Sequence, residues 1–252
     1  MSTNLNTAAN KVIGSENARS KGEQFQNIHI AKIETVFVNH RANLCAKIKQ
    51  WPSVVGCVAW LTDKAILAAM KGKVEGIVVQ KEDWLRPDSA DAADGLRQGI
   101  WRQNLRRLYD EAMRNKDENA CNIATGHYNS HLARISNGLS SMSSIMCAGV
   151  MPGNRDFRPN MHHKFLVFGE WKAGEPTSED DHTYPMFVPK AVWTGSFNFS
   201  ENASNSFENA IYIEDDAIAN SFYQEWSAVY ILSEPLDWEA EYMVPLQRLD
   251  DS

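Results

Sequence analysis

Two nearly continuous apolar runs constrain the fold of this chain more than any other feature. Residues 54–62, VVGCVAWLT, and 74–80, VEGIVVQ, have the composition of strands buried on both faces. Between them, Asp63 can cap a short helix over residues 64–71, which ends at Gly72. A strand, a helix and a strand in so short a segment predict a right-handed βαβ unit. We therefore expect an α/β protein.

The rest of the chain continues this alternation of strands and helices. Further strands are predicted where β-branched and apolar residues cluster, and helices where apolar residues recur at helical spacing. The predicted strands cover residues 33–39, 145–150, 161–168, 187–196 and 208–214, and the predicted helices cover residues 40–50, 96–113 and a segment that starts near 215. The arginines of the helix at 96–113 are expected mainly on its solvated faces.

The length of 252 residues fits one large domain, and a hydrophobic content of 43% is ample for its core. Residues 1–28 are polar and lack the apolar centre of a secretory signal, so we expect an N-terminal arm there. The domain then covers residues 29–252 and carries an acidic insertion at 169–186. No apolar run approaches the roughly 20 residues that span a bilayer, so no membrane association is expected.

The cysteines and histidines give no indication of a metal site. The four cysteines form no CxxC pair, which suits reduced thiols in a cytoplasmic protein. They are Cys45, Cys57, Cys121 and Cys147. His127 and His131 have helical i, i+4 spacing, but no third ligand lies near them in the sequence. We expect neither a metal nor another cofactor.

Two short motifs combine the residue types that phosphoryl transfer needs. The first, MHHKF, contains His162 and Lys164, and the second, TGSFNFS, contains Ser196 and Asn198. On a strand, side chains alternate, so His162 and Lys164 would point to one face and His163 to the other. A turn that carries Ser196 and Asn198 could bring a hydroxyl and an amide to the same place.

This set of residues offers a nucleophile together with neutral and cationic hydrogen-bond donors for a phosphodiester. It contains no cluster of carboxylates that would hold magnesium. The residues are therefore sufficient for phosphoryl transfer without a metal.

In this order, the two motifs resemble the HxK and GSxN signature of the phospholipase D superfamily, and their local sequence resembles its single-motif nuclease branch. The specific match covers roughly residues 146–230. The resemblance implies an α/β/α sandwich with a central mixed sheet and one HxK motif per chain.

The resemblance also implies roles for five residues. His162 would attack phosphorus and form a phosphohistidine, while Lys164 and Asn198 would hold the non-bridging oxygens. Ser196 would support that network, and Glu208 would accept a hydrogen bond from the far nitrogen of the histidine. Because the sequence contains one HxK, the second histidine of the mechanism would be His162 of another subunit, and the protein would be a homodimer.

The sequence departs from the superfamily pattern after the lysine. Where the pattern has an aspartate, this chain has Gly169, followed by Glu170, which we expect to substitute for it. The acidic insertion could repel unsuitable polyanions at the rim of the site or receive a regulatory protein partner. Arg155 and Arg158, just before the first motif, are candidates for phosphate contacts.

The function expected from these observations is a metal-independent phosphodiesterase, and specifically an endonuclease that cleaves DNA or RNA. The formal net charge of −7 gives no general attraction to nucleic acid, so such an enzyme needs a local basic surface. Two alternatives stay open: a phospholipid phosphodiesterase, and a non-catalytic binding protein with the same fold.

Overall fold

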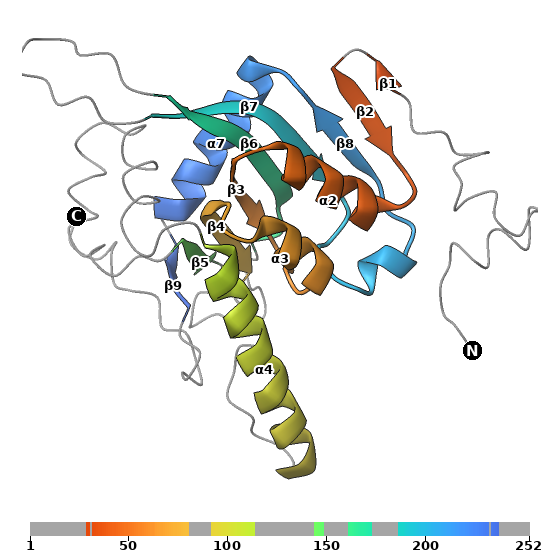
Figure 1. Cartoon of the computed structure of the whole chain (residues 1–252), viewed down its shortest axis with the longest axis vertical. Coiled ribbons are helices and arrows are strands. Elements are labelled where there is room, and N and C mark those ends of the chain that lie inside the picture. The colour runs from red at the N-terminus through yellow and green to blue at the C-terminus, as the bar shows by residue number, and fades with distance from the viewer. Residues whose placement is uncertain are drawn as a thin grey trace, which may run out of the picture.

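The centre of the molecule is a nine-stranded mixed β-sheet (Figure 1). The computed structural model describes residues 29–30, 32–80, 92–113, 144–148, 161–172, 186–231 and 233–236. In chain order, the strands are β1 (His29–Ile30), β2 (Ile33–Val36), β3 (Ser53–Val58), β4 (Val74–Gln80), β5 (Ile145–Ala148), β6 (Lys164–Lys172), β7 (Met186–Gly195), β8 (Ala210–Ile213) and β9 (Glu234–Pro235).

The strands lie in the order β1-β2-β8-β7-β6-β3-β4-β5-β9. Strands β3, β4 and β5 run parallel to one another, and the other neighbouring pairs are antiparallel. The parallel pair β3 and β4 is the βαβ unit that the two apolar runs predict. Every residue of both strands is buried, which explains why their sequences show no polar alternation.

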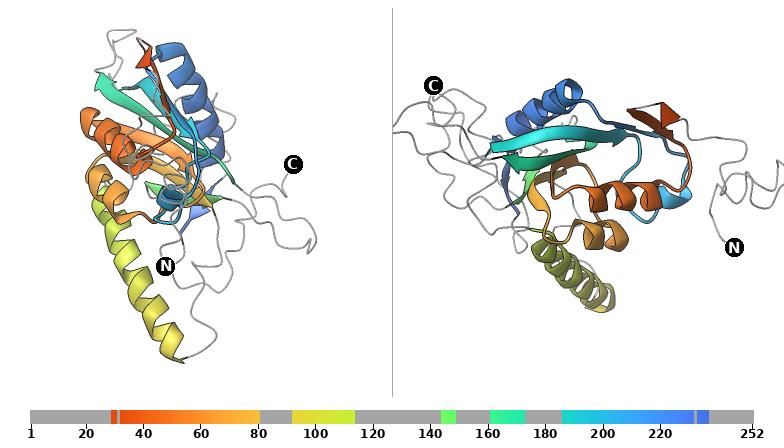
Figure 2. Two further views of the ribbon diagram at one scale, coloured as in Figure 1. Left: turned by 90° about the vertical axis from the view of Figure 1, so that its right-hand side faces the viewer. Right: turned by 45° about the horizontal axis from the view of Figure 1, so that its top comes forward.

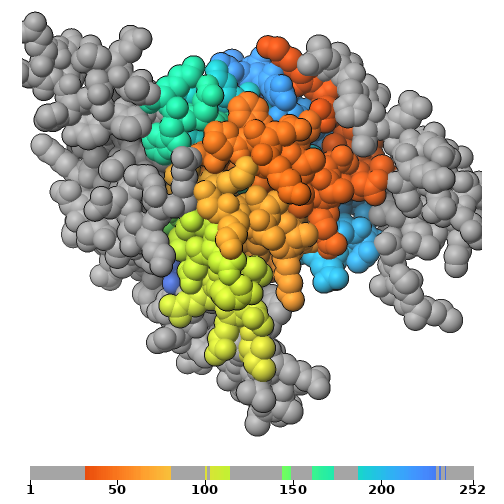
Figure 3. Space-filling view, viewed as in Figure 1, coloured from red at the N-terminus to blue at the C-terminus, as the bar shows by residue number. Residues whose placement is uncertain are grey.

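Helices cover both faces of the sheet, so the domain is an α/β/α sandwich, as the sequence predicts (Figure 2). The helices are α2 (His40–Gln50), α3 (Lys64–Met70), α4 (Ala92–Ala112) and α7 (Asp216–Ile231), with a 3₁₀ turn, η3, at Ala203–Asn205. Of the helices that the structure describes, α2, α3 and α4 lie on one face and α7 lies on the other. Figure 3 shows α2, α3 and α4 side by side on the surface. In the described ranges, no helix has both the length and the apolar character needed to cross a bilayer.

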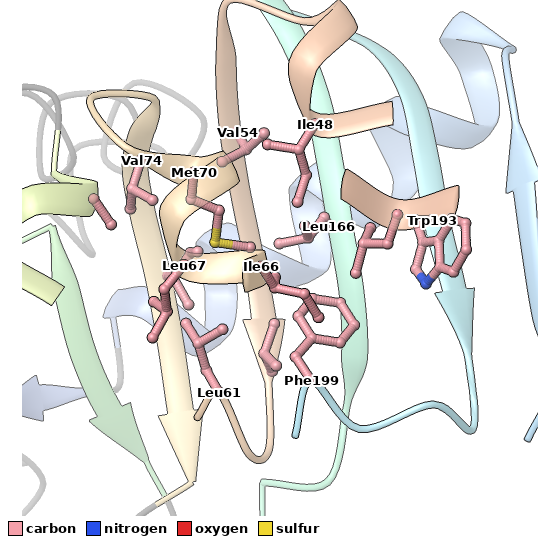
Figure 4. Close-up of a cluster of buried hydrophobic side chains, with 14 of the residues drawn as sticks. Ile48, Val54, Leu61, Ile66, Leu67, Met70, Val74, Leu166, Trp193 and Phe199 are labelled. Carbon is pink, nitrogen blue, oxygen red and sulfur yellow. The ribbon is translucent and has the colours of Figure 1, made fainter. Parts of the chain in front are cut away.

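Two hydrophobic clusters fill the two layers between helices and sheet. Side chains of β3 alternate between them: Val54 packs in the cluster under α2 and α3, and Val55 packs in the cluster under α7. Figure 4 shows the first cluster, in which Leu166 of β6 and Trp193 of β7 point toward the helices. In the second cluster, Trp226 of α7 is fully buried.

Helix α3 begins where the sequence predicts, at the residue after Asp63. The Asp63 carboxylate accepts hydrogen bonds from the backbone N–H groups of Ala65, at 2.9 Å, and Ile66, at 3.1 Å. These bonds satisfy donors that have no partner within the helix. The same carboxylate pairs with Arg41 of α2 at 2.5 Å, so the cap also links α2 to α3.

Several predicted bounds differ from the observed ones. Strand β2 ends at Val36, before the left-handed backbone of Asn39 (φ 57°) that precedes α2. Strand β6 continues to Lys172 and β7 starts at Met186, so both ends of the segment predicted as an acidic insertion belong to the sheet. The rest of that insertion, residues 173–185, lies outside the described residues, as does the predicted arm at 1–28.

Candidate active site

The sheet brings the two motifs together, although they are far apart in the sequence. Strands β6 and β7 are antiparallel neighbours, with Phe165 opposite Thr194. The start of β6, which carries Lys164, therefore lies beside the end of β7, which leads into Ser196. One expectation needs correction: His162 is not on the strand, because β6 begins at Lys164.

The backbone before β6 is nevertheless held against the sheet. The N–H of Ala59, just after β3, donates to the carbonyl of His163 over 2.8 Å. The His163 side chain lies 3.0 Å from Glu225 of α7 and its ring contacts Phe165. His163 thus points to the α7 side and has packing and hydrogen-bonding contacts there.

Lys164 supplies a cation next to the His162 imidazole. Its side chain is almost buried, and Nζ lies 3.2 Å from each ring nitrogen of His162. Nζ also donates to the His162 carbonyl over 2.9 Å. Burial lowers the pKa of Lys164, and the negative charge of Glu208 acts in the opposite direction. An exposed imidazole and a fixed ammonium therefore share one location at the end of the sheet.

Ser196 and Glu208 connect the end of β7 to the start of β8. The Ser196 hydroxyl donates to Glu208 Oε2 over 2.5 Å and accepts the N–H of Asn209 at 3.0 Å. The Ser196 N–H donates to the Asn209 carbonyl over 3.0 Å. Glu208 thus accepts a hydrogen bond from Ser196 within the described chain, and its expected hydrogen bond to a histidine stays a prediction.

Steric hindrance explains why the second motif has a glycine at position 195. A Cβ at Gly195 would lie 2.2 Å from the carbonyl oxygen of Asn209 and 2.6 Å from Cα of Ala210. Both are backbone atoms at the start of β8 or in the residue just before it, so they cannot move without disturbing the pairing of β7 and β8. Only glycine lets the chain approach β8 closely enough for Ser196 to reach Glu208.

Two aromatic anchors fix the turn that carries Asn198. Phe197 is buried and stacks on His40 with ring centroids 4.9 Å apart, and Phe199 is fully buried. The Asn198 Oδ1 atom between them is buried and has no hydrogen-bond partner among the described residues. A buried acceptor of this kind costs free energy unless water or a ligand supplies a donor. The turn therefore presents an amide in a fixed position.

Sequence reasoning missed Gln80, which holds the segment before the first motif. Gln80 ends β4 and is buried, and its Oε1 accepts the N–H of Met161 over 2.6 Å. Met161 directly precedes His162, so the Gln80 side chain fixes the backbone from which the imidazole projects. The signal in the sequence was a glutamine at the end of an otherwise buried strand, a position that calls for a specific hydrogen-bond partner.

The structure also explains the missing aspartate. A Cβ at Gly169 would lie 2.5 Å from both the Val188 carbonyl oxygen and the Phe187 ring, so an aspartate does not fit there. Glu170 is half-buried and lies 3.6 Å from the Lys172 ammonium, so it does not replace a buried acid.

A buried carboxylate in this part of the sheet comes instead from Glu75 of β4. It accepts hydrogen bonds from Ser53 at 2.8 Å and from the Trp171 indole at 2.9 Å. Ser53 lies opposite Gly169 in the sheet. The acid therefore reaches this region from a strand that the superfamily pattern does not mark.

Some predicted site residues cannot be placed. Arg155 and Arg158 lie outside the described residues, and so do His127 and His131. Within the described ranges, no group of three or more His, Cys, Asp or Glu side chains is arranged to hold a metal ion. The described part of the site thus consists of His162, Lys164, Ser196, Asn198 and Glu208.

Comparisons with known proteins give a viral protein of similar sequence and bacterial proteins of similar structure. No model of a known protein family matches the sequence. The chain is 29% identical over 216 residues to the uncharacterized protein L381 of Acanthamoeba polyphaga mimivirus, which covers 82% of this chain and 68% of that protein.

Three solved structures are similar to this chain, each with a TM-score of 0.40. NucT from Helicobacter pylori is 14% identical, and the match covers 81% of this chain and 98% of the NucT chain. Nuc from Salmonella typhimurium, a phospholipase D family member, is 16% identical, and the match covers 80% of this chain and 95% of the Nuc chain. Phosphatidylserine synthase from Haemophilus influenzae is 13% identical, and the match covers 88% of this chain and 44% of the synthase chain.

Proposed function

We propose that this protein is a metal-independent phosphodiesterase that acts as an endonuclease on DNA or RNA. The observation that carries the proposal is the pairing of the exposed His162 imidazole with the Lys164 ammonium at 3.2 Å, next to the turn of Ser196 and Asn198. A nucleophile and fixed donors at one point are the elements that phosphoryl transfer requires.

In the proposed reaction, a neutral nitrogen of His162 attacks phosphorus, and the bond from phosphorus to the leaving oxygen breaks. The Lys164 ammonium and the Asn198 amide donate to the non-bridging oxygens as charge builds on them. A second imidazole gives its proton to the leaving oxygen. The same imidazole then accepts a proton from water, whose oxygen attacks the phosphohistidine and releases His162.

The second imidazole has to be identified. His40 is buried, with Nε2 3.1 Å from the Val36 carbonyl, and His163 is turned toward α7. Among the histidine side chains that the structure describes, neither of these presents its ring beside Lys164. As the motif resemblance implies, we assign the role to His162 of the partner subunit, in a homodimer whose two-fold axis passes through the site.

A cleavage assay in excess EDTA tests this proposal. The wild-type protein is incubated with labelled single-stranded and duplex DNA, with RNA, and with phospholipid vesicles. We expect internal cleavage of at least one nucleic acid and no head-group release from the vesicles. Because the donors are protein side chains, the rate should not change when EDTA is replaced by Mg²⁺.

Two outcomes would contradict the proposal. Cleavage of the vesicles alone would identify a phospholipid phosphodiesterase, and binding of nucleic acid without cleavage would identify a binding protein. The mass in solution is measured in parallel, because a strict monomer would lack the second imidazole.

Gln80 gives a prediction about positioning. Gln80→Leu removes the acceptor that holds the Met161 N–H, so the His162 ring should lose its fixed position. We expect kcat for nucleic-acid cleavage to fall about 10- to 100-fold, with KM changed much less. Gln80→Glu keeps an acceptor oxygen and should recover most of the loss. A Leu variant with unchanged kcat would show that the bond serves stability alone.

A further inference from the structure

Trp60 is a large aromatic residue left partly in solvent beside the proposed nucleophile. Its side chain is 37% exposed, whereas its neighbours Ala59 and Leu61 are fully buried. Other tryptophans of the domain, Trp193 and Trp226, are also fully buried. Part of the indole surface is therefore accessible to a ligand that reaches His162.

The backbone holds Trp60 in place on both sides. On one side, Ala59 donates to the His163 carbonyl over 2.8 Å and accepts the N–H of Gln80 at 3.1 Å. The segment that carries Trp60 is thereby tied to the first motif.

On the other side, the Thr62 N–H donates to the Phe199 carbonyl over 2.9 Å, and the Tyr109 hydroxyl donates to the Leu61 carbonyl over 2.7 Å. Leu61 and Phe199 both point into the core cluster (Figure 4). The backbone on both sides of Trp60 is thus hydrogen-bonded to the two motifs, which fixes the place of Trp60 relative to the site.

The indole meets the imidazole edge to face. The ring centroids of Trp60 and His162 are 6.1 Å apart, and their planes are perpendicular. An indole beside the proposed nucleophile offers a flat apolar surface on which a nucleobase can stack.

We propose that Trp60 is a stacking surface for the nucleobase next to the scissile phosphate, and that the substrate is therefore single-stranded or locally unpaired nucleic acid. This inference rests on the proposed function. In a duplex, each base is already stacked on both sides and paired, so it reaches an indole only after it is extruded, which costs free energy. An unpaired base stacks without that cost.

The test combines a change in the protein with a change in the substrate. Trp60→Ala and Trp60→Phe are compared with wild type on a single-stranded oligonucleotide and on an oligomer of the same length made of abasic residues. Trp60→Ala should lower kcat/KM about 10- to 100-fold on the first substrate and less than about 2-fold on the abasic one. Trp60→Phe should retain most of the activity. Ile100→Ala, which changes an exposed apolar residue of α4, is the matched control and should behave as wild type.

The preference for single strands provides a second readout. Wild type should cleave the single strand faster than the same sequence as a duplex, and Trp60→Ala should reduce that ratio. An equal loss on the base-bearing and abasic substrates would overturn the proposal, because Trp60 would then act only by orienting His162.

Binding separates failure of this inference from failure of the proposed function. The affinity of both labelled oligomers is measured by fluorescence anisotropy in a His162→Asn background, where no cleavage is needed. Trp60→Ala should weaken binding of the base-bearing oligomer about 10-fold and leave the abasic one unchanged. If wild type cleaves neither oligomer, the proposed function fails, but the binding measurement still tests whether Trp60 stacks on a base. Equal affinities for the base-bearing oligomer with and without Trp60 would overturn the stacking proposal.

Discussion

Replacement of His162 by asparagine should abolish cleavage. We expect kcat to fall by at least about 10⁴-fold, because the variant loses both the nucleophile and, in the partner subunit, the group that protonates the leaving oxygen. Asparagine keeps a planar polar side chain at this exposed position, so the free energy of unfolding should change by less than about 0.5 kcal/mol. Cleavage of a labelled oligonucleotide and thermal unfolding are the two measurements.

The adjacent histidine is a matched control for this variant. His163→Asn removes an imidazole one residue away, but that ring contacts Glu225 and Phe165 on the α7 side. Its activity should stay within a few-fold of wild type. Equal losses in the two variants would show that the first motif has a structural role and no chemical one.

The covalent intermediate gives a direct readout of the nucleophile. Wild type quenched during turnover should carry a phosphoryl adduct on the peptide that contains His162, stable in base and labile in acid. The adduct should be absent from His162→Asn. An adduct on another residue would contradict the assignment of His162.

Replacement of Lys164 by methionine should have the second largest effect. Methionine fills a similar volume but removes the ammonium that lies 3.2 Å from the imidazole nitrogens. Loss of one fixed donor to the charged transition state typically lowers kcat about 10²- to 10³-fold. Lys164→Arg, which keeps the positive charge, should recover part of the activity. If Lys164→Met retained full kcat, the ammonium would have no part in the reaction.

The pKa of Lys164 also predicts how activity depends on pH. Burial lowers this pKa below its ordinary value near 10.5, although Glu208 acts in the opposite direction. The reaction uses the charged form, so activity should fall as the pH rises through the lowered pKa. Lys164→Arg should move this alkaline limit to higher pH, because the guanidinium stays protonated.

Stability should change in the opposite sense over the same pH range. Between the lowered pKa and 10.5, the unfolded chain binds more protons at Lys164 than the folded protein does. The contribution of this residue to the free energy of unfolding therefore increases with pH in that window. Lys164→Met removes the buried charge, so its unfolding temperature at neutral pH should not fall below that of wild type, as measured by calorimetry. A large fall would mean that the ammonium stabilises the fold.

Sequence patterns alone are enough to predict the α/β class, the βαβ unit and the types of residue in the candidate site. Runs such as 54–62 and 74–80 carry this information because a strand buried on both faces needs apolar side chains at nearly every position. Asp63 could be assigned as a helix cap because capping is local: its carboxylate reaches N–H groups two and three residues away.

Which side chains meet, in contrast, follows from the tertiary structure. Residue patterns show which face a side chain occupies, but not which strand lies beside it or in which register. The contact of Ser196 with Glu208, the hydrogen bond from Met161 to Gln80 and the position of Trp60 beside His162 all depend on how separate strands pair. Because these neighbours come from distant parts of the chain, their geometry is fixed only when the sheet assembles.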